Sequence, residues 1–204
     1  MTEAGVRRTQ AERRAETSAR LVDATIASIV EVGYARTSTK EICARAGVSH
    51  GALFGRFATV LDLMLAAAAE VARRQIEQFT ADLAPVPDQR DVTTVLGLLR
   101  ERARAPINSV WIELQVAART DADLRERLAP VVIEYVGAIF TAADAVPAFR
   151  EFAADRRDLL LLMSMHFFDG EGLTAVPYPW PELDEQRLGL LAEMVRQYRV
   201  DETE

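Results

Sequence analysis

Apolar residues recur at helical spacing along almost the whole chain of 204 residues, and this pattern restricts the fold more than any other feature. In a first helix predicted over about residues 10–32, Val22, Ile26 and Ile29 share one face. No segment shows sustained strand-like alternation between turn signals. The sequence therefore predicts an all-α protein with about nine helices.

Turn and capping residues divide this pattern into separate helices. Gly33 ends the first helix, and Gly47 allows a tight turn after a short second helix. The prolines between Pro177 and Pro181 exclude a helix and predict a connecting loop. The expected helices span about residues 10–32, from a cap at Thr37, Ser38 or Thr39 to Ala46, 50–56, 60–83, 91–104, 106–119, 121–144, 148–170 and 183–200.

Charge is distributed unevenly. Residues 1–60 contain eight arginines and one lysine against six acids, although the whole chain has a net charge of −7. A basic head on an acidic body predicts that only the head meets an anionic partner. The short helices occupy this head, so we predict a DNA-binding domain over residues 1–58 and a larger helical domain over residues 59–204.

Composition excludes several classes of protein. A single cysteine, Cys43, forms no disulfide within the chain, and one cysteine with two histidines is too few for a structural zinc site. The first twenty residues contain no apolar block, and no stretch reaches the roughly 18 apolar residues of a membrane span. We therefore expect a cytoplasmic protein without metal, cofactor or membrane segment.

The most informative segment runs from Thr37 to Phe57. It predicts two short helices joined by a glycine-bearing turn, the motif whose second helix enters the DNA major groove. Small side chains on that second helix let its backbone approach the groove closely. Hydroxyl residues lie at the helix ends, where phosphates bind. The predicted DNA-binding residues are Thr37, Ser38, Thr39, Lys40, Ser49, His50, Gly51, Ala52, Phe54, Gly55, Arg56 and Thr59.

Residues 10–63 resemble the DNA-binding domain of the TetR family of bacterial transcriptional regulators. Gly33-Tyr34, Thr37-Ser38, Ile42, Ala46-Gly47-Val48-Ser49, Gly51-Ala52-Leu53 and Phe57 carry the resemblance. It covers about a quarter of the chain at motif level. The rest agrees in helix count and in the segments Trp111-Ile112-Glu113-Leu114 and Asp123-Leu124-Arg125.

The head departs from the family pattern at three places. Phe54 replaces the usual tyrosine, and Arg56 replaces a histidine or tyrosine and adds a phosphate or guanine donor. Val60 and Leu61 replace a common lysine and acid at the start of the fourth helix. These changes redistribute the phosphate contacts.

Single residues of the head leave alternatives open. His50 is the best candidate for reading a base, and contact with a phosphate or water alone is the alternative. Arg45 is either a contact or part of a solvated face, and Cys43 is either a small buried residue or a redox sensor. Arg7, Arg8, Arg13 and Arg14 either reach the DNA or form a solvated tail.

The run from Leu159 to Phe168 is apolar on every face of a helix, so other helices must cover it all round. The last helix also has two apolar faces. The resemblance implies that these two helices of each chain form a four-helix bundle in a homodimer. The predicted interface residues are Leu159, Leu162, Leu188, Leu191, Val195 and Tyr198.

The resemblance also implies a ligand chamber between the helices of residues 59–170. Large or polar residues on mostly apolar helices are typical of such sites, and Trp111, Gln115, Tyr135, Met163, His166 and Phe167 are the candidates, each of which is otherwise ordinary core. A dinucleotide-like sequence from Gly170 to Ala175 lacks the necessary following helix and parallel sheet.

Together these observations predict a regulator, not an enzyme. We expect it to repress transcription as a homodimer on a palindromic double-stranded DNA operator and to leave it when a small apolar ligand binds. A helical ligand-binding or catalytic bundle with a vestigial head is one alternative. A DNA-binding architectural protein without a ligand is another, and it predicts binding without sequence preference.

Overall fold

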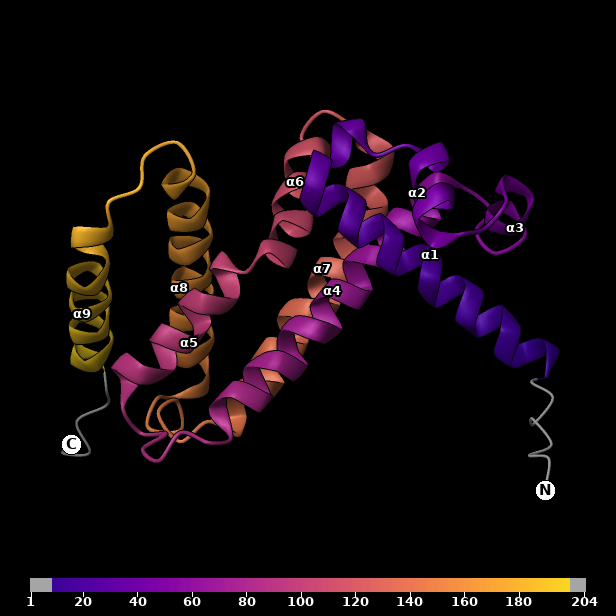
Figure 1. Ribbon diagram of the computed structural model, residues 1–204. Coiled ribbons are helices and arrows are strands. Elements are labelled where there is room, and N and C mark those ends of the chain that lie inside the picture. Colours follow the sequence, from indigo (N-terminus) through magenta and orange to yellow (C-terminus); the bar gives the residue numbers. More distant parts are fainter. Residues whose placement is uncertain (1–8, 199–204) are drawn as a thin grey trace, which may run out of the picture. The chain divides into compact units, whose positions relative to one another are not determined.

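The computed structural model describes residues 9–198. This part of the chain contains nine α-helices, two 3-10 helices and no strand, which confirms the predicted all-α class. Across the same residues no helix is long and apolar enough to cross a membrane. The elements are α1 Gln10–Val32, η1 Tyr34–Arg36, α2 Thr39–Ala46, α3 His50–Phe54, α4 Val60–Leu83, α5 Val92–Arg104, η2 Pro106–Asn108, α6 Ser109–Ala118, α7 Ala122–Asp144, α8 Ala154–Ala175 and α9 Pro181–Gln197 (Figure 1).

The predicted caps and turns of the first helices are present. Ser38 Oγ accepts a hydrogen bond from the N–H of Glu41 at the start of α2. Gly33 and Gly47 have φ angles of 83° and 63°, a region that L-residues with side chains rarely adopt. The local sequence therefore determines where α1 and α2 end.

In the structure α8 begins at Ala154, about half a dozen residues later than the sequence predicts. Residues 148–153 form turns instead of helix, and they bury Phe149 and Phe152 in the core. The N–H of Ala148 donates to Gln89 O at 2.9 Å, which ties this turn to the loop before α5. At the other end α8 continues through Gly170 to Ala175, so the dinucleotide-like segment is helical.

Two compact units make up the chain. Unit 1 comprises Met1–Val71 and Ser109–Val131, and unit 2 comprises Ala72–Asn108 and Val132–Glu204. α6 and parts of α4 and α7 belong to the same compact unit as the helices of the head, and the functional boundary near residue 58 stays a prediction. In unit 1, Tyr34 N–H donates to the Glu113 carboxylate of α6 at 3.2 Å.

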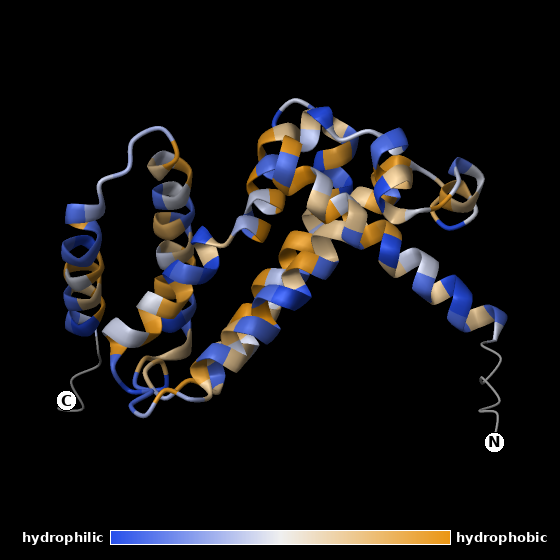
Figure 2. Ribbon diagram, in the orientation of Figure 1, coloured by the Kyte–Doolittle hydropathy of each residue, from blue (hydrophilic) through white to orange (hydrophobic). Residues whose placement is uncertain are grey.

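Apolar side chains from each of the first three α-helices are buried in unit 1. Leu21 and Ile29 from α1, Ile42 from α2 and Leu53 from α3 are all at most 1% exposed. Figure 2 shows mainly hydrophilic residues in the N-terminal half of α1 and hydrophobic ones toward its C-terminal half. The buried half of α1 is therefore the platform for α2 and α3.

Unit 2 has its own core, in which α5 packs against both α8 and α9 (Figure 1). Leu96 of α5, Phe168 of α8 and Ala192 of α9 are each at most 1% exposed. Burial of a side chain as large as leucine or phenylalanine contributes roughly 1.5–3 kcal/mol. These contacts make α5 the central helix of unit 2.

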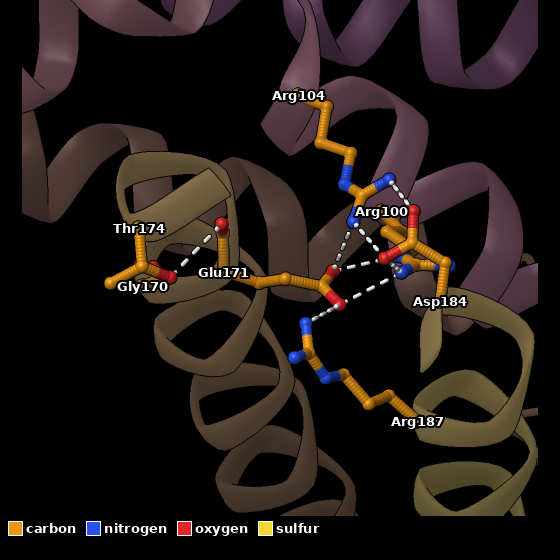
Figure 3. A network of polar contacts seen from close by, with 7 residues as sticks. All are labelled: Arg100, Arg104, Gly170, Glu171, Thr174, Asp184 and Arg187. Carbon is orange, nitrogen blue, oxygen red and sulfur yellow. Dashed lines mark hydrogen bonds and ion pairs between the residues drawn. The ribbon is translucent and has the colours of Figure 1, made fainter. Parts of the chain in front are cut away.

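A network of charged side chains joins the same three helices (Figure 3). Glu171 of α8 accepts two hydrogen bonds from Arg100 of α5, at 2.6 Å and 2.8 Å. Arg104 and Asp184 form a second bidentate pair, at 2.7 Å and 3.0 Å, and Arg187 lies 3.7 Å from the Glu171 carboxylate. The pKa of Asp184 is lowered by its hydrogen bond with Arg104. Arg100 and Glu171 are almost fully buried, and Arg100 also pairs with Asp184 at 2.9 Å and Glu171 with Arg104 at 3.3 Å. The network as a whole therefore compensates the buried charge.

We predict that Glu171→Gln lowers the free energy of unfolding by about 3 kcal/mol, because it removes the buried anion that the buried Arg100 and the half-buried Arg104 and Arg187 share. The amide has nearly the shape of the carboxylate, so no cavity is created. Urea denaturation measures the change, with Glu193→Gln on the exposed side of α9 as the control. Equal stability of the two variants would show that Glu171 is not the centre of the network.

Candidate functional site

The turn between α2 and α3 is held by a distant arginine that the sequence analysis did not single out. The guanidinium of Arg20 in α1 donates to the backbone oxygens of Ala46 and Gly47, the latter at 3.2 Å. A cation at this place also offsets the partial negative charge at the C-terminus of α2. The turn requires glycine for its φ angle, and a β-carbon on Gly47 would lie 2.9 Å from Arg20 Nη2 and so displace this guanidinium from its contacts.

The predicted DNA-binding residues lie mostly at the surface. Their exposure follows from the shortness of α2 and α3, each of which buries one side against α1. Those classed as exposed are Ser38, Lys40, Ser49, His50, Gly51, Phe54, Gly55 and Thr59, and those half-buried are Thr37, Thr39, Ala52 and Arg56.

Several of the predicted hydroxyl groups have structural roles in this surface. Thr37 Oγ1 donates to Gly33 O at 2.9 Å and so closes the turn after α1. Ser49 Oγ accepts from the N–H of Ala52, which caps α3. A serine that accepts in a cap still carries a hydroxyl hydrogen that can be donated to a phosphate.

Phe54 in α3 and Arg56 directly after it, which both depart from the family pattern, differ in exposure. The Phe54 ring is 50% exposed, so it presents an apolar face at the surface. Arg56 is half-buried, and its Nε is shielded from solvent without a hydrogen-bond partner, while Nη1 donates to Gly55 O at 3.4 Å. A contact from Arg56 to DNA must therefore use the terminal nitrogens.

Two other head residues, Arg45 and Cys43, have defined surroundings. Arg45 pairs with Glu31 at 2.6 Å and Glu41 at 3.2 Å, which raises the pKa of its guanidinium and places it on a face with its own counter-ions. Cys43 is buried, and desolvation raises the pKa of its thiol, which favours the interpretation as a small core residue.

The four arginines at the N-terminus divide into two groups. Arg13 and Arg14 are exposed residues of α1 and are therefore helical rather than part of a tail. The contacts predicted for Arg7 and Arg8 lie outside the described residues.

The start of α4 is fixed by a capping arrangement and an ion pair. Thr59 Oγ1 accepts from the N–H of Asp62 at 3.0 Å, and Asp62 accepts from the N–H of Thr59 at 2.7 Å. Asp62 also pairs with Arg127 of α7, and the hydrogen bond with this arginine lowers the pKa of the carboxyl. Arg127 was not anticipated, because it is far from Asp62 in the sequence.

The predicted ligand residues do not gather in one compact unit. Trp111 and Gln115 belong to unit 1, where Trp111 is buried at 3% exposure and Gln115 is exposed. The members in unit 2 are the half-buried Tyr135 and the exposed Met163, His166 and Phe167.

The predicted interface residues also separate by exposure. Leu188 and Val195 are 8% and 3% exposed in the core of unit 2, so they pack within their own chain and are not available to a partner. Leu162 and Leu191 are half-buried, and Leu191 packs against that core. Leu159 and Tyr198 are exposed.

A sequence profile of bacterial regulatory proteins of the tetR family matches residues 21–67, which include the whole of α2, the turn and α3. The uncharacterized HTH-type transcriptional regulator Rv2912c of Mycobacterium tuberculosis is 43% identical over 189 residues, which are 92% of this chain and 97% of the relative. The chain belongs to the TetR family. It is a DNA-binding transcriptional regulator and not an enzyme.

Solved structures share the fold of this TetR-family chain. The multidrug binding protein EbrR, complexed with imidazole, matches with a TM-score of 0.67 at 23% identity and covers 100% of both chains. FadR from Bacillus subtilis, in complex with stearoyl-CoA, matches with a TM-score of 0.60 at 18% identity over 85% of this chain and 97% of its own. At these identities the likeness concerns the fold.

Gly47 and Gly51 provide a matched test of this site. Gly47→Ala should lower the free energy of unfolding by at least about 1 kcal/mol, because it combines an unfavourable φ with a close contact. The β-carbon added by Gly51→Ala would contact only Ser49 Oγ, at 3.8 Å, so this variant should keep the stability of the fold.

Gly51→Ala should nevertheless weaken DNA binding, because a methyl group is added to the exposed side of α3. Urea denaturation and fluorescence anisotropy with labelled DNA measure the two effects, and normal DNA binding by a folded Gly51→Ala protein would place the contact surface elsewhere.

Proposed function

We propose that this regulator occupies a palindromic operator as a homodimer, represses transcription there, and leaves the operator when a small ligand binds to its body. The observation that carries this proposal is an apolar surface on α8 and α9 that the chain itself leaves uncovered. The exposed fractions of its residues are 59% for Leu159, 58% for Met163, 41% for Phe167, 60% for Leu190 and 50% for Met194.

The spacing of these residues supports a helix-to-helix interface. Leu159, Met163 and Phe167 follow one another at four-residue intervals on α8, and Leu190 and Met194 do so on α9. Residues at this spacing lie on one side of a helix. Exposed apolar stripes of this kind are typical of surfaces that another protein covers. A second copy of the chain supplies the same stripe, as a two-fold interface requires.

A dimer gives the DNA surface its symmetry. Two copies of α3 related by a two-fold axis match half-sites about 34 Å apart along the duplex, which explains why a palindrome is expected. The intact caps of α2 and α3 and the Arg20 contact at the turn argue against a vestigial head. An architectural protein would bind all sequences alike.

Fold neighbours with ligands in the crystal support the regulatory part of the proposal. EbrR is described as a multidrug binding protein, and FadR was solved with stearoyl-CoA. Both molecules have the fold of this chain, so a ligand in the helical body is consistent with its architecture. Release follows if the ligand binds less tightly to the DNA-bound form, because the coupling of two binding sites is reciprocal.

We expect His50→Ala to relax sequence choice and Arg56→Ala to weaken binding to every sequence. Loss of a base contact removes about 1–3 kcal/mol of discrimination, whereas loss of a phosphate contact reduces the salt dependence of affinity by about one unit of slope. Anisotropy titrations at several salt concentrations measure both, using a duplex selected by the wild-type protein and a scrambled duplex.

Arg150→Ala is the control for net charge, because it removes one positive charge from a loop of unit 2. It should leave sequence choice and salt slope unchanged. If Arg56→Ala behaves in the same way as Arg150→Ala, the phosphate role assigned to Arg56 is wrong.

We also predict that Met163→Glu and Leu190→Glu each weaken dimerisation by about a hundredfold, because a carboxylate in the interface lacks a partner and costs about 3 kcal/mol. Sedimentation velocity measures the association, and circular dichroism verifies the fold. Ile133→Glu is the matched control, since Ile133 is an exposed apolar residue of α7 at 72% exposure and lies outside the stripe. Dimers that withstand both stripe substitutions would contradict the proposed interface.

A further inference from the structure

A chain of buried hydrogen bonds in unit 2 ends on a carboxylate. Gln75 of α4 and Asn108 of η2 are only 5% and 6% exposed. Gln75 Nε2 lies 3.4 Å from Asn108 Oδ1, and Asn108 Nδ2 donates to Asp169 Oδ1 of α8 at 2.9 Å. Tyr135 of α7 and His166 of α8 lie close to Asp169. The charge of Asp169 raises the pKa of Tyr135, and His166 lowers the pKa of Asp169. Four elements of unit 2 therefore contribute polar groups to one place.

The two amides in this cluster have no donor left for a further group. Gln75 Nε2 also donates to Arg102 O at 3.1 Å, and Asn108 Nδ2 also donates to Ala103 O at 2.9 Å. An amide nitrogen has two hydrogens, so both donors of each side chain are used. In contrast, Asp169 Oδ2 accepts no hydrogen bond from the residues that the structure describes. The two amides thus have no free donor, whereas Asp169 has an open acceptor.

The charge of Asp169 is also incompletely compensated. Across residues 9–198 no arginine or lysine forms an ion pair with it. Burial raises the pKa of the Asp169 carboxyl, although the hydrogen bond from Asn108 and the nearby His166 oppose this shift. Burial and the Asp169 charge raise the pKa of Tyr135, whose phenol stays neutral. A partly buried carboxylate without an arginine or lysine partner is costly, and such groups occur where a ligand completes the site.

We propose that Asp169, with Asn108, Gln75, Tyr135 and His166 around it, is the polar end of the ligand site and binds an ammonium group on an otherwise apolar ligand. The inference rests on the proposed function, because it specifies the ligand that this function requires. It changes the expectation of a purely apolar ligand to that of an apolar amine. An ammonium supplies both of the missing elements, a hydrogen-bond donor for Oδ2 and a positive charge.

Other ligand chemistries fit the cluster less well. A carboxylate or phosphate would bring a second negative charge to Asp169 and meet amides whose donors are already engaged. A neutral alcohol supplies a donor but no charge. A hydrogen bond that involves a charged group is about twice as strong as one between neutral groups, so the amine should be preferred over the alcohol.

Three probes with one apolar body test the proposal, namely phenylbutylamine, phenylbutanol and phenylbutyrate. Isothermal titration calorimetry on the full chain at neutral pH should show the amine binding most tightly. Asp169→Asn should weaken the amine at least about tenfold and the alcohol less than about twofold, because the variant removes the charge and keeps the acceptor for Asn108. The unliganded Asp169→Asn protein should melt about 2–4 °C higher, because its cluster no longer contains an uncompensated charge.

Asp155→Asn is the matched control, since it removes one carboxylate from the exposed first turn of the same helix. It should leave the affinity for the amine unchanged. The proposal is overturned if the amine does not bind, if Asp169→Asn binds it as tightly as the wild type, if both variants weaken it equally, or if phenylbutyrate binds best.

Operator binding by the same proteins separates this inference from the proposed function. Amine binding that depends on Asp169 while operator affinity stays constant would support the ligand site and contradict ligand-controlled release. Release of the operator by the amine that is identical in the wild type and Asp169→Asn would support regulation and overturn the role of Asp169.

Discussion

The fold of the head depends on one constraint, which is that a helix as short as α3 has no stability of its own. Isolated helices shorter than about 12–15 residues are marginal in water, and α3 spans only His50–Phe54. Its conformation is imposed by the Ser49 cap, by Leu53 buried in the core of unit 1, and by the turn at Gly47. Arg20 holds that turn to α1, so the position of α3 depends on the core beneath it.

The same core extends into the body through α6. Tyr34, at the turn after α1, donates its backbone N–H to Glu113, and α6 packs against α1. Asp62, which caps α4 directly after the head, pairs with Arg127 of α7. Within unit 1, α6 and the adjoining parts of α4 and α7 are therefore fixed by polar contacts at defined atoms. This explains why the compact unit is larger than the DNA-binding motif.

Unit 2 combines an apolar core with buried charged side chains, which affect its stability and its helix packing differently. The apolar contacts among α5, α8 and α9 supply stability without strong directional preference. The pairing of Arg100 with Glu171 also restricts the packing, because an arrangement of α5 and α8 that separates them loses the two hydrogen bonds that compensate buried charge. With the buried faces of α8 and α9 set in this way, Met163, Phe167, Leu190 and Met194 remain outside.

The sequence by itself determined the all-α class, most helix boundaries and the helix-turn-helix, because helical periodicity, caps at Ser38 and Ser49 and the positive φ of Gly47 act over a few residues. It also identified the residues exposed on α3. It could not determine which apolar face of α9 is buried, since Leu188 and Leu190 are equally apolar and only packing against α5 distinguishes them. Nor could it reveal Arg20 at Gly47, Arg100 at Glu171 or Asn108 at Asp169, pairs that lie 27, 71 and 61 residues apart. Only tertiary structure decides such contacts, because their energy depends on distance in space and on burial, which a linear pattern does not contain.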